Sequence, residues 1–138
     1  MMPQNVFKQT FSRIDAKHRE DMMKIIQYTN VNAVHYGSEE AKGIAARVVI
    51  GKNDGAENFC MRVFEFSPGG YSRRHSHDWE HEMFIHSGRG EFYSEGQWYS
   101  AITGDVVFIP SNEEHQIRNP DEELLIIVCP LASKAPEL

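Results

Sequence analysis

Short apolar stretches separated by turn residues divide the chain from residue 46 onward, and this pattern constrains the fold more than any other feature. Gly, Pro, Asn and Asp occupy the breaks between the stretches. Short strands with a turn about every ten residues predict an antiparallel sandwich or barrel, and a closed barrel leaves few free edges around an interior wide enough for a small ligand. The predicted strands are 46–50, 59–66, 83–86, 90–94, 97–102, 106–109, 115–118 and 124–129.

The first 45 residues lack this alternation of short apolar stretches and turn residues. Residues 12–28 carry a partial helical stripe of apolar side chains among charged ones, which predicts one short helix. Residues 30–44 fit either an irregular segment or a single strand. We therefore predict an N-terminal extension over 1–45 with a short helix that serves as a dimer arm, a barrel over 46–130 and a C-terminal tail over 131–138.

The composition is that of one globular domain. The chain has 138 residues, of which 41% are hydrophobic and 25% charged. A net charge of −6 argues against a nucleic-acid partner or an anionic membrane surface. The sequence has no apolar stretch long enough to span a bilayer, and its first residues do not have the pattern of a signal peptide. Isolated Cys60 and Cys129 predict reduced, buried thiols. We therefore expect a cytoplasmic protein.

Four histidines in two clusters are the strongest functional signal. His75 and His77 lie two residues apart, so an extended chain directs both imidazoles to the same face. His81 follows after a short polar break, and His115 comes much later in the sequence. A lone His-x-His pair is usually a solvated loop, but neutral imidazole is also the commonest side-chain ligand of divalent transition metals. The residues around the two clusters favour the metal site.

Both clusters have flanking residues at regular positions. The first runs Gly69, five residues, His75-x-His77, His81-Glu82 and Gly88, and the second runs Gly104, five residues, Pro110, four residues, His115, three residues and Asn119. With these two motifs the chain resembles the cupin superfamily, whose members carry the same residue types at these spacings. Asn112 stands where the family usually has Gly, and since both residues tolerate positive φ the turn is expected to survive.

The resemblance implies an all-β fold, a double-stranded β-helix (jelly-roll) barrel, with a divalent metal inside. It implies that His75, His77 and His115 face inward as ligands. The third ligand of the first motif is either His81, as in a four-histidine subgroup, or Glu82, as in cupins with three histidines and one glutamate. These two residues are adjacent, so the pleat points only one of them inward. The local string His-Asp-Trp-Glu-His-Glu is most similar to the four-histidine subgroup, which favours His81.

The residues near the motifs supply candidates for a pocket. Met83 and Ile85 share the face of His81, and Ile117 shares the face of His115. Trp79 is interpreted as a packing residue at the barrel mouth. The candidates for acid–base chemistry are Glu80, Glu82, Tyr71 and Tyr93. The candidates for contact with an anionic ligand are Arg62, Tyr71, Arg73 and Arg74, although each arginine taken singly is expected at the surface.

Four protein ligands on an octahedral ion leave two adjacent positions, which suit a bidentate oxygen ligand such as an organic acid or enediol. The metal is expected to be manganese, iron, nickel or zinc. The resemblance covers dioxygenases, decarboxylases and isomerases, and the fold cannot choose among them. The alternative is a non-enzymatic protein that senses a small molecule or a metal. A homodimer is expected because an apolar strand such as 59–66 has surface to cover.

Overall fold

The computed structural model describes residues 22–138. The predicted helix therefore lies in part outside the described residues. Its remaining part, residues 22–27, is not helical and leads into a single 3-10 turn, η1 (Tyr28–Asn30). The Lys24 ammonium ties this segment to the barrel, because it donates to the Val49 carbonyl and forms an ion pair with Asp54 at 2.7 Å.

The described residues that follow η1 contain nine strands and one further 3-10 turn, η2 (Lys52–Asp54). The predicted strands 97–102 and 106–109 have the same bounds in the structure, and the other predicted strands are found with ends shifted by up to five residues. The segment left open by the sequence contains a strand, β1. The strands are β1 (Val34–Gly37), β2 (Lys42–Ile50), β3 (Phe59–Tyr71), β4 (His81–Ser87), β5 (Arg89–Ser94), β6 (Gln97–Ile102), β7 (Val106–Ile109), β8 (Gln116–Arg118) and β9 (Leu125–Ala132).

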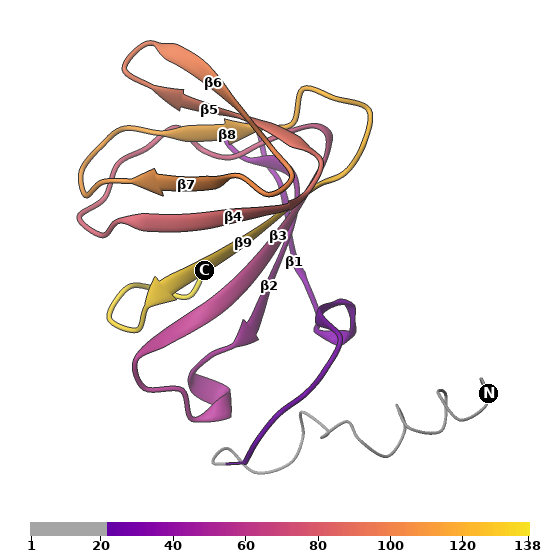
Figure 1. The fold of residues 1–138 in the computed structure, drawn as a ribbon, viewed down its shortest axis with the longest axis vertical. Helices are drawn as coiled ribbons and strands as arrows, with labels where there is room; N and C mark the ends of the chain where they lie inside the picture. Colours follow the sequence, from indigo (N-terminus) through magenta and orange to yellow (C-terminus); the bar gives the residue numbers. More distant parts are fainter. Residues whose placement is uncertain (1–21) are drawn as a thin grey trace, which may run out of the picture.

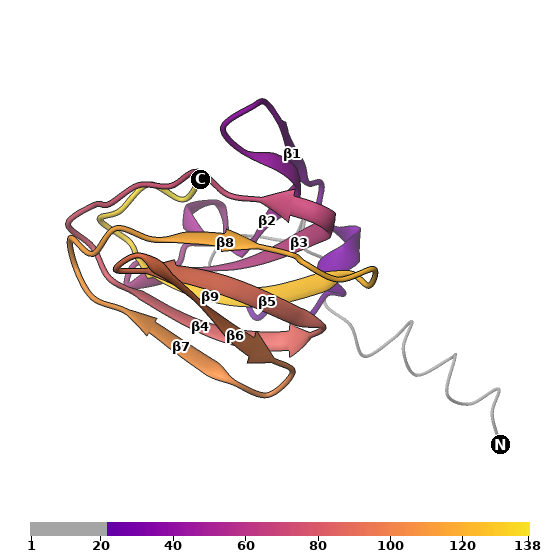
Figure 2. The same ribbon diagram turned by 90° about the horizontal axis from the view of Figure 1, so that it is seen from above.

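All described strand pairs are antiparallel and form one continuous sheet that curls into a barrel (Figures 1 and 2). The order is β6-β5-β8-β3-β9-β4-β7, with β2 paired to the other side of β3 and β1 paired to β2. Strand β3 lies between β2 and β9 for most of its length and reaches β8 only through the pair Tyr71–Arg118. Figure 1 accordingly shows β5, β6 and β8 grouped above β9, β3 and β2. The all-β barrel prediction is confirmed.

One predicted break was wrong. The segment Pro68-Gly69-Gly70 does not end a strand, because β3 continues through it to Tyr71. The register shows how the strand accommodates it: Phe66 pairs with Ile44 and Tyr71 pairs with Lys42, so four residues of β3 bulge opposite one residue of β2. Gly69 has φ +80°, a conformation that glycine adopts without strain. The strand therefore bends into the histidine segment instead of ending before it.

The core follows from alternation along the strands. In β4 the residues His81, Met83 and Ile85 are buried while those between them are exposed, and β9 buries every second residue from Leu125 onward. Both cysteines are free and buried, as the sequence predicted. The main hydrophobic cluster consists of Ile44, Phe66, Met83, Ile85, Phe92, Ala101, Ile109, Ile117, Leu125, Ile127 and Cys129.

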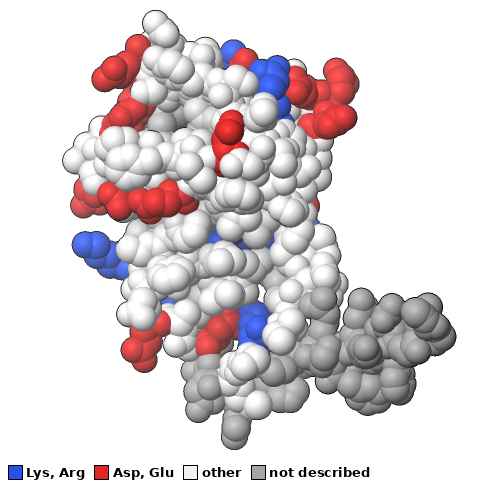
Figure 3. Space-filling model, in the orientation of Figure 1, with Lys and Arg blue, Asp and Glu red and all other residues white. Residues whose placement is uncertain are grey.

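The outer surface carries the negative charge of the chain. Acidic side chains lie at several places on the face shown in Figure 3, while the Lys and Arg side chains drawn there form no continuous patch. Within residues 22–138, the helical segments are too short and too polar to cross a bilayer.

Candidate metal centre

Three elements bring the histidines together inside the barrel. His75 and His77 lie in the segment that follows β3, and His81 opens β4. His115 immediately precedes β8 and is joined to His75 by two backbone hydrogen bonds of 2.9 and 3.1 Å, so the two residues lie side by side on neighbouring chains. The turn before His115 is held by Asn112, which has φ +67° and donates its N–H to the His77 carbonyl. The expected positive-φ turn is therefore present without glycine.

Three imidazole rings lie mutually close, and a fourth lies beside two of them. Ring centroids of His75, His77 and His115 lie 4.8 to 5.0 Å apart. The candidate ligand nitrogens of these three residues lie within 4.8 Å of one another. His81 does not belong to this mutually close group, yet its Nε2 is 3.0 Å from Nε2 of His77 and its ring is 5.2 Å from that of His115. The structure thus brings together all four histidines that the motifs single out.

Two of the rings have their tautomers set by backbone carbonyls. Nδ1 of His77 lies 2.8 Å from the Trp79 carbonyl, and Nδ1 of His115 lies 2.9 Å from the Glu113 carbonyl. A carbonyl can only accept, so each Nδ1 carries the proton and each Nε2 is unprotonated. Trp79 also stacks on His77 with ring centroids 4.1 Å apart and planes 8° from parallel. Its packing role is thus specific: it fixes the orientation of one ligand candidate.

The site favours neutral imidazoles. Burial, followed by the charges of neighbouring histidines, lowers the pKa of His81 to about 3 and that of His75 to about 4, from an ordinary 6.5. Burial also lowers the pKa of His77. A neutral imidazole is the form that binds metal, because protonation occupies the lone pair.

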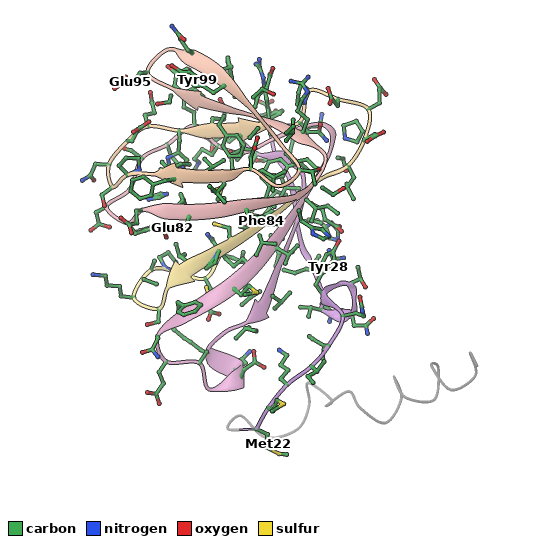
Figure 4. The ribbon with its side chains drawn as sticks, in the orientation of Figure 1. Met22, Tyr28, Glu82, Phe84, Glu95 and Tyr99 are labelled. Carbon is green, nitrogen blue, oxygen red and sulfur yellow. The ribbon has the colours of Figure 1, made fainter. Side chains whose placement is uncertain are left out.

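The adjacent residues of the first motif point in opposite directions. The side chain of His81 is buried and lines the cavity, whereas Glu82 is exposed on the outer face of β4, where Figure 4 labels it near Phe84. Glu80 is exposed as well. Because the pleat alternates, only His81 among these three shares the interior with the other histidines.

A cavity of about 420 Å³ adjoins the histidines. Of the pocket candidates from the sequence, Met83 and Ile117 line the cavity, whereas Ile85 is fully buried and does not. Sequence reasoning missed several lining residues from β1, β2, β3 and the tail. They are Tyr36, Ile44, Phe64, Phe66, Pro136 and Leu138.

The acid–base candidates named from the sequence do not line this cavity. Tyr71 donates its hydroxyl proton to the Glu39 carbonyl, and Tyr93 lies under the Arg74 guanidinium at 3.6 Å. With Glu80 and Glu82 on the outside, the polar lining comes instead from Tyr36 and Glu40 among other residues. Nothing in the local sequence marks these two, since both belong to the N-terminal region whose pairing with the barrel only the fold reveals.

Arg62 was expected at the surface and is buried. It is 6% exposed and lines the cavity. Its Nη2 donates to Sγ of Cys129 at 3.0 Å, and that sulfur lies 3.6 Å from Nδ1 of His81. The alternation of side chains along β3 indicates this buried position, because residues 60, 62, 64 and 66 share one face of the strand and the three besides Arg62 are apolar.

The donor set fits a divalent transition metal. Imidazole nitrogens sit about 2.0–2.1 Å from such an ion, so two ligands at right angles lie about 3 Å apart. That is the separation of the Nε2 atoms of His77 and His81. With Nδ1 of His77 and His115 bound to carbonyls, the lone pairs that remain are on Nε2. A metal bound here would act as a Lewis acid on an oxygen ligand in the cavity.

Residues 62–130, half of the chain, match the family model for the cupin domain. The chain belongs to the cupin family. The match begins in β3 at Arg62, ends in β9 and includes all four histidines.

Solved cupin structures share the fold over most of the chain. The polyketide cyclase RemF from Streptomyces resistomycificus is 29% identical, with a TM-score of 0.78 over 83% of this chain and 82% of that one. A cupin-2 domain protein from Rhodospirillum rubrum is 26% identical, with a TM-score of 0.70 over 83% and 78%.

A curated relative is also similar to part of the chain. It is a 1-methylthio-D-xylulose 5-phosphate methylsulfurylase of Rhodospirillum rubrum, 39% identical over 70 residues. The match covers 50% of this chain and 44% of that protein, so this cupin spans less than half the length of that relative.

Proposed function

We propose that this cupin holds one divalent transition metal through His75, His77, His81 and His115 and uses it to bind a small molecule by two adjacent oxygens. The convergence of the histidine nitrogens at the cavity carries this proposal. The buried position of His81 and the outward position of Glu82 support the four-histidine set. Four ligands on an octahedral ion would leave two neighbouring positions, which chelating oxygens fill best.

The cavity supports a ligand larger than a minimal dicarboxylate. At about 420 Å³ it falls within the range of sites for drug-sized molecules, and oxalate would leave most of it empty. Its walls are largely apolar, with Ile44, Phe64 and Met83 among them. The ligand therefore has a chelating oxygen head and an apolar body.

The chemistry follows from what the metal and the chain each contribute. The metal would polarise the bound oxygens, and the apolar walls would exclude water from the rest of the ligand. Tyr36 and Glu40 are candidates for proton transfer because they line the cavity. The relatives carry out different reactions by name, a polyketide cyclisation and a methylsulfurylase reaction, so the proposal extends to metal-dependent activation of an oxygen ligand and to no single reaction class.

Metal reconstitution tests this function. Untagged protein loaded separately with manganese, iron, nickel and zinc and then dialysed should retain near one equivalent of at least one metal by elemental analysis. His115→Ala should lose it, because it removes a nitrogen from the mutually close group, whereas His86→Ala, at an exposed position, should not. Failure of every metal to remain bound to the wild type would contradict the proposal.

Ligand binding separates the two classes of function. Organic acids and enediols with apolar bodies are to be titrated against the metal-loaded protein and then followed for turnover with and without dioxygen. Consumption of dioxygen would indicate a dioxygenase, and loss of carbon dioxide or a carbonyl shift would indicate a decarboxylase or isomerase. Tight binding without turnover would favour a sensor.

We also propose a homodimer. The outer face of the β4–β7 pair carries Phe84, Val106 and Phe108, which are 44%, 78% and 61% exposed. Three large apolar side chains together on one sheet face mark a surface that a second copy can cover.

A further inference from the structure

The cavity contains a buried positive charge that the metal centre does not use. Arg62 projects from β3, is 6% exposed and lines the same cavity as the histidines. A guanidinium stays protonated at any accessible pH, so this group is a permanent cation inside the barrel. Within residues 22–138, none of the salt bridges of the structure includes Arg62.

The contacts of the guanidinium are with uncharged acceptors. Nε donates to the Cys129 carbonyl at 3.2 Å, and Nη2 donates to the thiol of the same residue. Nη1 reaches Glu137, but through the backbone carbonyl at 3.3 Å, since the Glu137 carboxylate accepts from the backbone N–H of Lys52 instead. The guanidinium also lies 4.9 Å from the centre of the Phe64 ring, which is a cavity wall.

These contacts satisfy hydrogen bonds without supplying a counter-charge. Three of the five N–H groups of Arg62 are used, which leaves one on Nη1 and one on Nη2. Taking an uncompensated cation out of water is costly, and buried charges are normally paired. Contacts that only joined β3 to β9 and to the tail would not require a positive charge at this position.

We propose that Arg62 is the anion-binding residue of this cavity and that the ligand of this cupin carries a carboxylate, separate from its chelating head, that pairs with the guanidinium. The inference rests on the proposed metal centre and names the substrate class: a chelating oxygen head, an apolar body and an anionic end. The two free N–H groups match the two oxygens of a carboxylate, and the apolar surroundings strengthen the pairing.

A second cation at the cavity provides a matched control. Arg73 also lines the cavity, but its side chain is 60% exposed and it already forms an ion pair with the Glu40 carboxylate at 3.0 Å. Water and this partner both weaken its attraction for a further anion. Arg62→Met and Arg73→Met therefore remove the same charge from a buried unpaired position and from an exposed paired one.

The test uses two series of metal chelators with the cobalt-loaded protein. One series consists of alkyl hydroxamates of increasing chain length, and the other consists of the same hydroxamates with a terminal carboxylate. Calorimetry and the visible spectrum of the cobalt report binding. At the chain length that reaches Arg62, the carboxylate should improve Kd by about tenfold or more, which is typical of a hydrogen bond to a charged group. Arg62→Met should abolish this preference, and Arg73→Met should retain it.

The outcomes separate the two proposals. If cobalt or the plain hydroxamates do not bind, the metal-centre function fails. If they bind and the wild type shows no carboxylate preference at any chain length, the role of Arg62 is refuted while the metal centre stands. Loss of the preference in Arg73→Met, with Arg62→Met unaffected, would also overturn it. Should Arg62→Met not fold, the wild-type and Arg73→Met comparisons still decide the question, and Arg62→Lys, which keeps the charge, should preserve part of the preference.

Discussion

The metal-free protein should lose stability as the pH falls below 6.5. Burial holds the pKa of His81 at about 3 in the folded state, while the unfolded chain takes up a proton near the ordinary value of 6.5. Between these two values the unfolded state binds more protons than the folded state, so acid favours unfolding. The stability that the neutral imidazole contributes is therefore complete above pH 6.5 and declines down to about pH 3.

The size of the effect follows from the protonation of the unfolded state. At pH 5 the unfolded histidine is almost fully protonated and folded His81 is not, so this residue should lower the free energy of unfolding by up to about 2 kcal/mol relative to pH 7.5. His75, with its pKa lowered to about 4, acts in the same direction, but it is only half-buried and solvent screens part of its effect.

Urea unfolding of metal-free protein at pH 7.5 and pH 5 measures this difference. His81→Gln removes the titrating group, and the loss of stability on acidification should shrink by up to about 2 kcal/mol. His86→Gln is the control, because His86 is exposed and should leave the pH dependence of the wild type intact. If His81→Gln keeps the full wild-type pH dependence, the assignment of a buried neutral imidazole is wrong.

Two other predictions concern the barrel and its assembly. Asn119 is 1% exposed, donates to the carbonyls of Phe66 and Glu123 at 2.8 Å and accepts from a backbone N–H. Asn119→Ala should therefore lower the free energy of unfolding in urea by about 2 to 4 kcal/mol. Asn53→Ala, at an exposed position, should lower it little, and equal effects of the two variants would refute the reasoning. Light scattering at micromolar concentration should give twice the monomer mass, and Phe108→Glu should shift it toward the monomer; a monomeric wild type contradicts the proposed dimer.

The sequence predicted the barrel well because turns and strands are encoded locally. Gly88 illustrates this: it has φ +91°, and a Cβ there would collide with the Leu124 carbonyl, so the strand corner requires glycine. The break at Pro68 was predicted wrongly for the complementary reason. Whether such a segment ends a strand or bulges within it depends on the partner strand, and the neighbour that accommodates it is Gly43, with φ +71°.

The candidate site was predictable in its histidines and much less so in its walls. The motif spacing identified the imidazoles because each histidine lies at a characteristic spacing from a turn residue, Gly or Pro, nearby in the sequence. The cavity is closed by residues from distant parts of the chain, such as Tyr36 and Leu138, which only the three-dimensional pairing brings together. Arg62 was misplaced because a charged side chain on a strand is ordinarily solvated, whereas this one lies on the buried face of β3.

X-ray absorption spectroscopy of the zinc-loaded protein tests the central claim most directly, because it counts imidazole ligands at the bound metal. The account predicts four imidazoles in the wild type, four in Glu82→Gln and three in His81→Ala, since His81 lies inside the barrel and Glu82 outside it. Three imidazoles and a carboxylate in the wild type, with the carboxylate lost in Glu82→Gln, would contradict it.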